Sequence, residues 1–251
     1  MQLMDGPLLS CTGCRNGAEF PIPFSMAFQP IVDVATGKPF AYEALVRGVS
    51  GEDAPTILDV VNDTNRYGFD QACRVKAIEG AMAAGLMETG AKLSINFLPN
   101  AVYSPVACIQ LTLKTARQCD MPLDRLIFEF TEGEEMISPL HVKAIIDAYK
   151  QMGFGVAIDD FGAGHAGLDL FAHFTPDMVK IDMDLVRGID GDRRRQAIVR
   201  GIMAMCAELD TTVIGEGVET QAECDTLADL GIRYMQGYLF ARPGFECLPA
   251  V

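Results

Sequence analysis

Short apolar runs alternate with helical segments along most of this chain. Eight runs rich in Val, Ile and Phe and bounded by Gly, Pro or Asp are predicted as strands: Phe24–Asp33, Pro39–Arg47, Lys92–Phe97, Arg125–Thr131, Gly155–Asp159, Met178–Asp182, Thr212–Gly215 and Arg233–Gln236. After the first two, helical spacing follows each strand, as in Thr56–Tyr67, Asp70–Ala83, Pro139–Met152, Arg194–Glu208 and Gln221–Leu230. Eight strands joined in this way predict a TIM-like (β/α)8 barrel.

The first two predicted strands should form an antiparallel pair. Only Val34–Lys38 separates them, and five residues containing a Gly can close a hairpin but cannot hold a crossover helix. The predicted barrel therefore has its first strand reversed. A doubly wound open sheet is the alternative, but no Gly-rich phosphate fingerprint follows an early strand.

Charge and composition exclude several classes of partner. The 251 residues carry a formal charge of −14, which argues against binding long nucleic acids. No apolar run is long enough to span a membrane, and the first residues do not resemble a signal peptide. Most of the eight cysteines lie in apolar runs, as reduced thiols of a cytoplasmic protein would.

The first 23 residues are predicted to be a leader, followed by one folded domain over 24–251. The leader contains one CxxC pair, Cys11 and Cys14, with no further zinc ligands at suitable spacing nearby. Two interpretations stay open: a flexible tail that carries two thiols, or a redox or metal clip.

Polar residues gather at the predicted strand ends, where a barrel places its catalytic groups. Each acid alone could be a surface residue or a helix cap. Together they would form a buried ring of carboxylates, which requires compensating cations. None of the three histidines stands at a strand end, and oxygen ligands alone favour Mg²⁺, Mn²⁺ or Ca²⁺. The candidate ligands are Glu43, Asn96, Glu129, Asp159, Asp160 and Glu216.

Two basic residues stand among these acids. Lys180 either compensates their charge or stabilises the negative charge that develops on a phosphoryl group. Arg47 follows Glu43 by four residues on one strand, so both should face the same side, where Arg47 could bind a phosphate. Two ions about 3.5–4 Å apart would clamp a phosphodiester and activate a water.

Several motifs in order resemble the EAL domain family of cyclic di-GMP phosphodiesterases. The resemblance spans about Phe28 to Pro243 and rests on seven matches: Phe28-Gln29-Pro30-Ile31, Glu43-Ala44-Leu45-Val46-Arg47-Gly48, Glu129-Phe130-Thr131-Glu132, Asp159-Asp160-Phe161-Gly162, Val179-Lys180-Ile181-Asp182, Glu216-Gly217-Val218-Glu219-Thr220 and Gln236-Gly237-Tyr238. It implies metal-dependent hydrolysis of one phosphodiester bond of cyclic di-GMP to linear pGpG, in a homodimer.

The resemblance also implies a role for each matched residue. One ion, Mg²⁺ or Mn²⁺, would bind Glu43, Asn96, Glu129 and Asp159, and a second would share Asp159 and add Asp160 and Glu216. Ca²⁺ is expected to bind and inhibit. Lys180 and Glu216 would act on the attacking water. The substrate would be positioned by Gln29, Leu45, Arg47, Asp182 and Gln236, with Glu132 and Glu219 in supporting positions.

Two other functions remain in view. A non-catalytic cyclic di-GMP receptor acting through a regulatory protein partner would share the fold, although such receptors usually lack one of these residues and this chain has them all. A magnesium-dependent TIM-barrel lyase or isomerase would explain the acids but not the ordered motifs.

One departure from the family pattern lies in the loop after Gly162, where Ala163–Gly167 replaces the frequent Thr-Gly-Tyr-Ser-Ser. In the family this loop is expected to couple metal binding to dimerisation.

Overall fold

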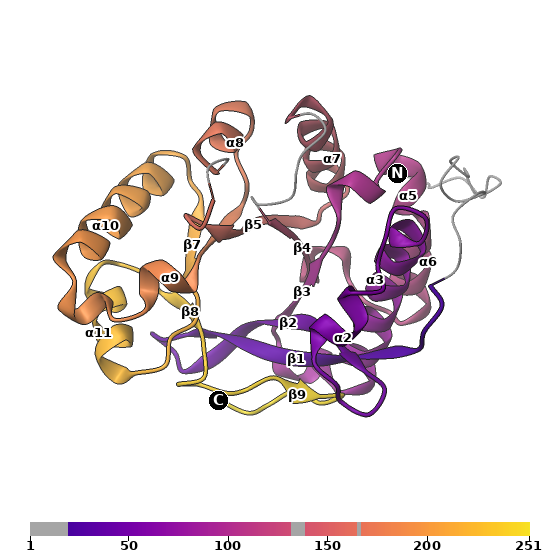
Figure 1. Ribbon diagram of the computed structural model, residues 1–251, viewed down its shortest axis with the longest axis horizontal. Coiled ribbons are helices and arrows are strands. Elements are labelled where there is room, and N and C mark those ends of the chain that lie inside the picture. The colour runs from indigo at the N-terminus through magenta and orange to yellow at the C-terminus, as the bar shows by residue number, and fades with distance from the viewer. Residues whose placement is uncertain (1–19, 132–138, 165–166) are drawn as a thin grey trace.

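The chain forms a closed barrel of eight strands with helices around its outside (Figure 1). The computed structural model describes residues 20–131, 139–164 and 167–251. The strands are β1 (Phe24–Asp33), β2 (Lys38–Gly48), β3 (Lys92–Asn96), β4 (Leu126–Thr131), β5 (Gly155–Phe161), β6 (Met178–Ile181), β7 (Thr212–Gly215) and β8 (Tyr234–Gln236), with a short ninth strand, β9 (Gly244–Phe245), outside the barrel ring.

The strand order confirms the predicted TIM-like barrel with its first strand reversed. Strands β2 to β8 follow one another in parallel, and β1 closes the ring by pairing antiparallel with both β2 and β8. The hairpin turn is tight because Asp33 O accepts hydrogen bonds from Thr36 N at 3.1 Å and Gly37 N at 2.8 Å. Gly37 has a φ of 65°, a left-handed conformation that costs glycine little.

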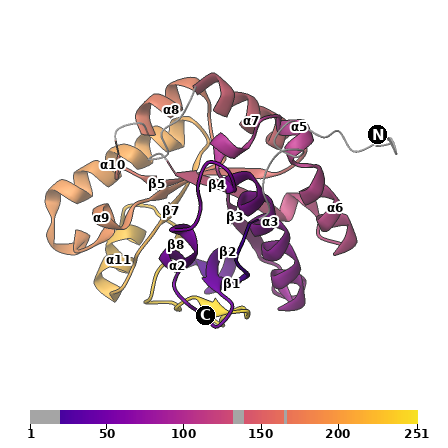
Figure 2. The same ribbon diagram turned by 45° about the vertical axis from the view of Figure 1, so that its right-hand side comes forward.

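Helices and 3₁₀ turns cover the outside of the barrel (Figure 2). They are α2 (Ala54–Leu58), α3 (Arg66–Ala83), α4 (Leu86–Thr89), η1 (Pro99–Ala101), α5 (Pro105–Cys108), α6 (Gln110–Gln118), η2 (Leu123–Arg125), α7 (Pro139–Gln151), α8 (Gly167–His173), α9 (Met183–Val186), η3 (Ile189–Gly191), α10 (Arg193–Glu208) and α11 (Gln221–Asp229). None of the helices described is long and apolar enough to cross a membrane.

The helix predicted over Thr56–Tyr67 was wrong. Helix α2 ends at Leu58, and a turn separates it from α3. In that turn Asn65 Oδ1 accepts a hydrogen bond from Asn62 N at 2.8 Å, and Asn62 Oδ1 accepts one from Thr64 N at 3.0 Å. These side chains offer the backbone partners that compete with a helix.

Two apolar layers enclose the strands. The larger lies between the barrel and its helices, with members such as Phe128 and Tyr149. The smaller fills the barrel itself and consists of Ile31, Ala41, Ile127, Ala157, Met178 and Ile214. Side chains alternate along a strand, so the next residues facing inward lie two positions further along. This inner layer is therefore the floor on which the residues at the barrel mouth stand.

The cysteines follow the sequence interpretation only in part. Six free cysteines occur in the described ranges, and four of them are buried: Cys73, Cys108, Cys206 and Cys224. Cys11 and Cys14 lie outside the described residues, so both interpretations of the CxxC pair stay predictions.

Candidate active site

A layer of polar side chains lies directly above the apolar floor. Most of its members stand two residues beyond a floor residue, toward the carboxyl ends of the parallel strands. On the reversed β1 the polar residue comes two positions earlier. They are Gln29, Glu43, Ser94, Glu129, Asp159, Lys180, Glu216 and Gln236. Side chains alternate along each strand with a period of two, so closure of the barrel brings the inward-facing polar residues together in a ring at one mouth.

Lys180 lies at the centre of this ring. Its Nζ is 2.8 Å from Glu216 Oε1, 2.9 Å from Asp159 Oδ1, 3.0 Å from Glu129 Oε2 and 3.2 Å from Glu43 Oε2. The side chain is only 1 % exposed. Since an unpaired ammonium at this depth would cost several kcal/mol, its four carboxylate partners are what keep it buried.

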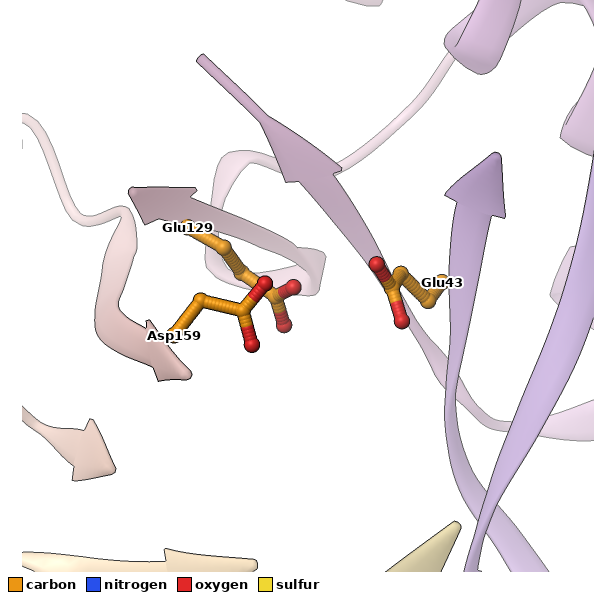
Figure 3. A group of neighbouring side chains, drawn as sticks. All are labelled: Glu43, Glu129 and Asp159. Atoms are coloured by element: carbon orange, nitrogen blue, oxygen red, sulfur yellow. The ribbon is translucent and has the colours of Figure 1, made fainter. Parts of the chain in front are cut away.

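Three carboxylates converge from separate strands (Figure 3): Glu43 from β2, Glu129 from β4 and Asp159 from β5. One ligand oxygen from each lies within 4.8 Å of the others. Asn96 joins them because its Nδ2 donates to Glu43 Oε1 at 2.8 Å. Neutral groups also donate to these carboxylates: Ser94 Oγ donates to Glu129 Oε1, and Gln236 Nε2 donates to Glu43 Oε2 at 2.8 Å, the oxygen that Lys180 also contacts.

A bulge in β5 allows two consecutive aspartates to face the site. In a regular strand Asp160 would point away from the side that Asp159 faces. The pairing of β5 with β6 shifts register between Ile158 and Phe161, and Asp160 has a φ of 53°. As a result, Asp159, Asp160 and Glu216 also offer oxygens within 4.8 Å of one another. Such bulges re-aim side chains at functional sites, and the left-handed backbone of Asp160 costs about 1–3 kcal/mol.

Burial and mutual repulsion perturb the carboxylates. Burial raises the pKa of Glu129 to about 8, assisted by the charges of Glu43 and Asp159 and opposed by Lys180. The pKa of Asp160 rises to about 6 through burial and the charge of Asp159. Burial raises the pKa of Glu216 well above its usual range, and Asp159 adds to it. Although burial disfavours the Lys180 ammonium, the four carboxylates outweigh it and raise its pKa.

The donor set suits divalent cations. With all five carboxyl groups ionised and Lys180 protonated, the cluster carries a formal charge of −4, which two divalent ions would neutralise. Asp159 Oδ1 is buried and receives no hydrogen bond of good geometry from the described residues, although Lys180 Nζ lies 2.9 Å away. All the donors are oxygens, which favours Mg²⁺, Mn²⁺ or Ca²⁺. The acidic cluster could therefore hold metal ions.

Two pockets flank the carboxylates. A cleft of about 270 Å³ contains the expected substrate residues Gln29, Asp182 and Gln236, with Tyr238 at its exposed edge. Asp182 also caps α9, because its Oδ1 accepts a hydrogen bond from Asp184 N at 2.8 Å. Within the cleft, Gln236 Nε2 donates to Gln29 Oε1 at 3.2 Å.

The second pocket is larger, about 450 Å³, and mostly apolar. It is lined by Leu45, Arg47 and Asn96, among others. Arg47 therefore lies in this neighbouring pocket and does not line the cleft that contains Glu43. Its Nη1 donates to Val46 O at 2.7 Å. The hydrogen bond between Asn96 and Glu43 joins the walls of the two pockets.

The two supporting residues have different outcomes. Glu219 lines the cleft and forms an ion pair with Arg187 of the segment after α9. Glu132 lies outside the described residues, as does part of the altered loop Ala163–Gly167.

Ser94 and Arg187 belong to the site but were not predicted from the sequence. Ser94 precedes Asn96 by two residues on β3, so the strand period could have placed it on the inner face beside the ligands. Its burial beside Glu129 follows from closure of the barrel. Arg187 lies in an irregular segment, and its pairing with Glu219 crosses between two loops, for which no local pattern exists.

The family model described as EAL domain matches residues 23–243. A standalone versatile EAL protein from Vibrio cholerae O395, solved in its c-di-GMP-bound form, is 49% identical, with a TM-score of 0.88 over 92% of this chain and 96% of that chain. Klebsiella pneumoniae BlrP1, solved with manganese and cyclic di-GMP at pH 6, is 33% identical, with a TM-score of 0.84 over 90% of this chain and 57% of that one.

Curated relatives are longer than this chain. The blue light- and temperature-regulated antirepressor BluF of Escherichia coli K12 is 32% identical over 90% of this chain and 55% of its own length. The probable cyclic di-GMP phosphodiesterase PdeN of the same organism is 26% identical over 88% of this chain and 43% of its own length. The chain thus spans about half the length of these relatives. BlrP1 has also been solved with calcium and cyclic di-GMP.

Proposed function

The chain belongs to the EAL domain family, and on that premise we propose that it hydrolyses one phosphodiester bond of cyclic di-GMP to give linear pGpG. The observation that carries the proposal is the buried Lys180 ammonium within 3.2 Å of four carboxylates. A structural ion pair would need one carboxylate for one ammonium. The excess of acids at a barrel mouth instead suits metal-assisted phosphodiester hydrolysis.

Each group of the site takes a defined part in this proposal. Glu43, Asn96, Glu129 and Asp159 would hold one divalent ion, and Asp159, Asp160 and Glu216 would hold a second. Such ions would supply a lowered pKa of water and neutralisation of charge on the phosphodiester. Lys180 holds its proton and stabilises negative charge on the phosphoryl oxygens, because its surroundings favour the charged form. Glu216 accepts a proton from the attacking water.

The two pockets suit a substrate with two nucleotide halves. One half occupies the cleft, where Gln29, Asp182 and Gln236 offer polar contacts, and the other occupies the apolar pocket beside Leu45 and Arg47. The guanidinium of Arg47, which lines that pocket, is suited to a phosphate. The scissile bond then lies over the carboxylates between them.

The test is cleavage of cyclic di-GMP by the purified protein with Mg²⁺ or Mn²⁺, followed by chromatography of the products. We expect linear pGpG to form with metal, and neither with EDTA nor with the Glu43→Ala variant, which controls for contaminating enzymes. Ca²⁺ should compete and inhibit, because it takes more ligands in a looser geometry than Mg²⁺. Intact substrate with either metal would contradict the proposal.

A second candidate function is that of a receptor which binds cyclic di-GMP without cleaving it and acts through a protein partner. The relative BluF, named an antirepressor, favours this candidate. A receptor would leave cyclic di-GMP intact in the cleavage assay. In equilibrium dialysis it would bind the nucleotide, which could then be recovered unchanged. A homodimer, a regulatory partner and a cytoplasmic location accompany both candidates as predictions, and sedimentation tests the first of these.

A further inference from the structure

Arg74 is a fully buried cation outside the barrel mouth. It lies on α3, and no part of its side chain is exposed. Its guanidinium carbon lies 5.2 Å from the ring centroid of Phe128, 5.4 Å from that of Phe97 and 5.9 Å from that of Tyr149. Burying a guanidinium is costly unless its partners are well placed, so the surroundings of Arg74 call for a specific explanation.

Arg74 connects two helices to the loop that follows β3. Its Nη1 donates to Tyr149 Oη of α7 at 2.8 Å, and its Nη2 lies 2.8 Å from Asp70 Oδ2. The other oxygen of the Asp70 carboxylate accepts a hydrogen bond from Leu98 N at 3.0 Å. The buried ion pair therefore does more than join neighbouring turns of α3, because Asp70 also binds the backbone of another element.

The bound loop carries a proposed metal ligand. Asn96 ends β3, and the next two backbone N–H groups are both anchored: Phe97 N donates to Glu129 O at 2.8 Å, and Leu98 N donates to Asp70. The side chain of Asn96 then reaches Glu43. The rings of Phe97 and Phe128, which pack on Arg74, belong to the immediate neighbours of Asn96 and Glu129.

From these contacts we propose that Asp70 is a positioning residue for the metal site, which acts through Leu98 to hold Asn96 against Glu43. Arg74 pairs with the other oxygen of the Asp70 carboxylate, and Gln71 Nε2 donates a hydrogen bond to that same oxygen at 3.1 Å. The inference rests on the proposed metal-dependent function. Partners that orient metal ligands typically contribute 10–100-fold to metal affinity, and Asp70 should do the same through the backbone.

The test separates positioning from plain stability. In the double variant Asp70→Leu/Arg74→Met both buried charges are replaced by apolar groups, a change that is often neutral for stability, while the acceptor for Leu98 N is lost. Tyr149→Phe is the matched control, because it removes a hydrogen bond from Arg74 at the end remote from Leu98. The readout is the affinity for Mn²⁺, measured from the electron paramagnetic resonance signal of the free ion, alongside thermal denaturation.

We expect the double variant to bind Mn²⁺ about 10-fold more weakly. In hydrolysis it should need more Mn²⁺ for half-maximal rate, with little change in KM for cyclic di-GMP. The control should keep wild-type affinity despite a lower Tm. Affinity within two-fold of wild type in the double variant, or an equal loss in the control, would overturn the proposal.

Two further outcomes remain decisive. Should the double variant not fold, the variant Asp70→Asn replaces it in the test. Its amide keeps an oxygen that can accept the hydrogen bond from Leu98 N, so Mn²⁺ affinity should be largely kept. A loss of more than ten-fold in the Mn²⁺ affinity of this variant would count against positioning. A wild-type protein that binds Mn²⁺ as described but leaves cyclic di-GMP intact would refute hydrolysis while leaving the role of Asp70 standing. One that binds no Mn²⁺ would refute both.

Discussion

At the scale of single residues, Lys180 is the most constrained group in the described part of the chain. It stands on β6, and its ammonium contacts carboxylates from four other segments of the barrel. The strand period predicts that Lys180 faces inward. Its four contacts depend on the distances between strands across the closed barrel, and no local sequence pattern encodes these distances.

Replacing Lys180 with Met should abolish most of the hydrolysis and spare metal binding. Met fills a similar volume but carries no charge, so the negative charge at the reacting phosphate loses a stabilising partner. Removing such a group typically lowers kcat about 100- to 1,000-fold. Steady-state kinetics with saturating Mn²⁺ would measure this loss. A kcat within three-fold of wild type would mean that Lys180 only compensates charge.

The raised carboxylate pKa values predict a pH-dependent affinity for metal. In the metal-free protein Glu129 holds a proton below a pKa of about 8 and Asp160 below a pKa of about 6, and a bound cation must displace these protons. Mn²⁺ affinity should therefore rise from pH 6 to 8 and level off above it, with proton release at pH 7. Titration calorimetry in buffers of different ionisation enthalpy measures the release. Affinity that is flat across this range would contradict the shifted pKa values.

At the scale of elements, Glu223 of α11 ties two loops at the edge of the cleft. Its carboxylate accepts hydrogen bonds from Gly188 N at 2.8 Å, Glu219 N at 2.9 Å and Thr220 N at 3.0 Å. Thr220 completes a capping box by accepting from Glu223 N. Arg187 directly precedes Gly188, and Glu219 is itself anchored by Glu223; these two residues form the ion pair at the cleft.

The variant Glu223→Gln should lower the free energy of unfolding by about 1–2 kcal/mol, since amides accept backbone hydrogen bonds more weakly than carboxylates. Burial raises the pKa of Glu223, but the backbone donors outweigh it and the net shift is downward. The contribution is thus present above the unfolded pKa of about 4.3 and lost as the pH falls through the lower folded value. Urea denaturation at pH 7 and at lower pH measures both effects.

The exposed Asp225 on the same helix provides the control for this prediction. Asp225→Asn should leave stability within about 0.5 kcal/mol of wild type. Equal losses for the two variants, or a deficit in Glu223→Gln that does not shrink in acid, would show that the three backbone bonds are not the cause.

The elements also show where sequence patterns work and where they fail. Strands β1 and β7 begin and end at the predicted residues, because their apolar alternation and flanking turn residues are local signals. The apolar residues around Asn62–Asn65 have helical spacing, which led to the wrong prediction of a helix. The chain forms a turn there instead, because the side chains of Asn62 and Asn65 accept backbone hydrogen bonds. Strand β9 was missed because its two residues pair only where the chain returns to Ala27 and Phe28.

At the scale of the whole molecule, metal binding should stabilise the fold. Without metal the barrel mouth holds five carboxylates around one ammonium. The protein as a whole already carries a formal net charge of −14. A ligand at 100 times its Kd that binds only the native state adds about 2.7 kcal/mol. Mn²⁺ should therefore raise Tm by several degrees, and EDTA should reverse the rise. Glu43→Gln should reduce the shift, whereas a shift that survives this substitution would place the metal elsewhere.

Local periodicity and connection length predict the strand order, the antiparallel hairpin, the chemical type of the donors and the face on which each donor except Asp160 lies. Tertiary structure decided the rest. Closure of the barrel placed the Lys180 ammonium among its carboxylates, a bulge turned Asp160 toward the site, and Arg47 came to lie in a pocket separate from the Glu43 cleft. Distances and burial decided these features, and both arise only when strands far apart in sequence pack together.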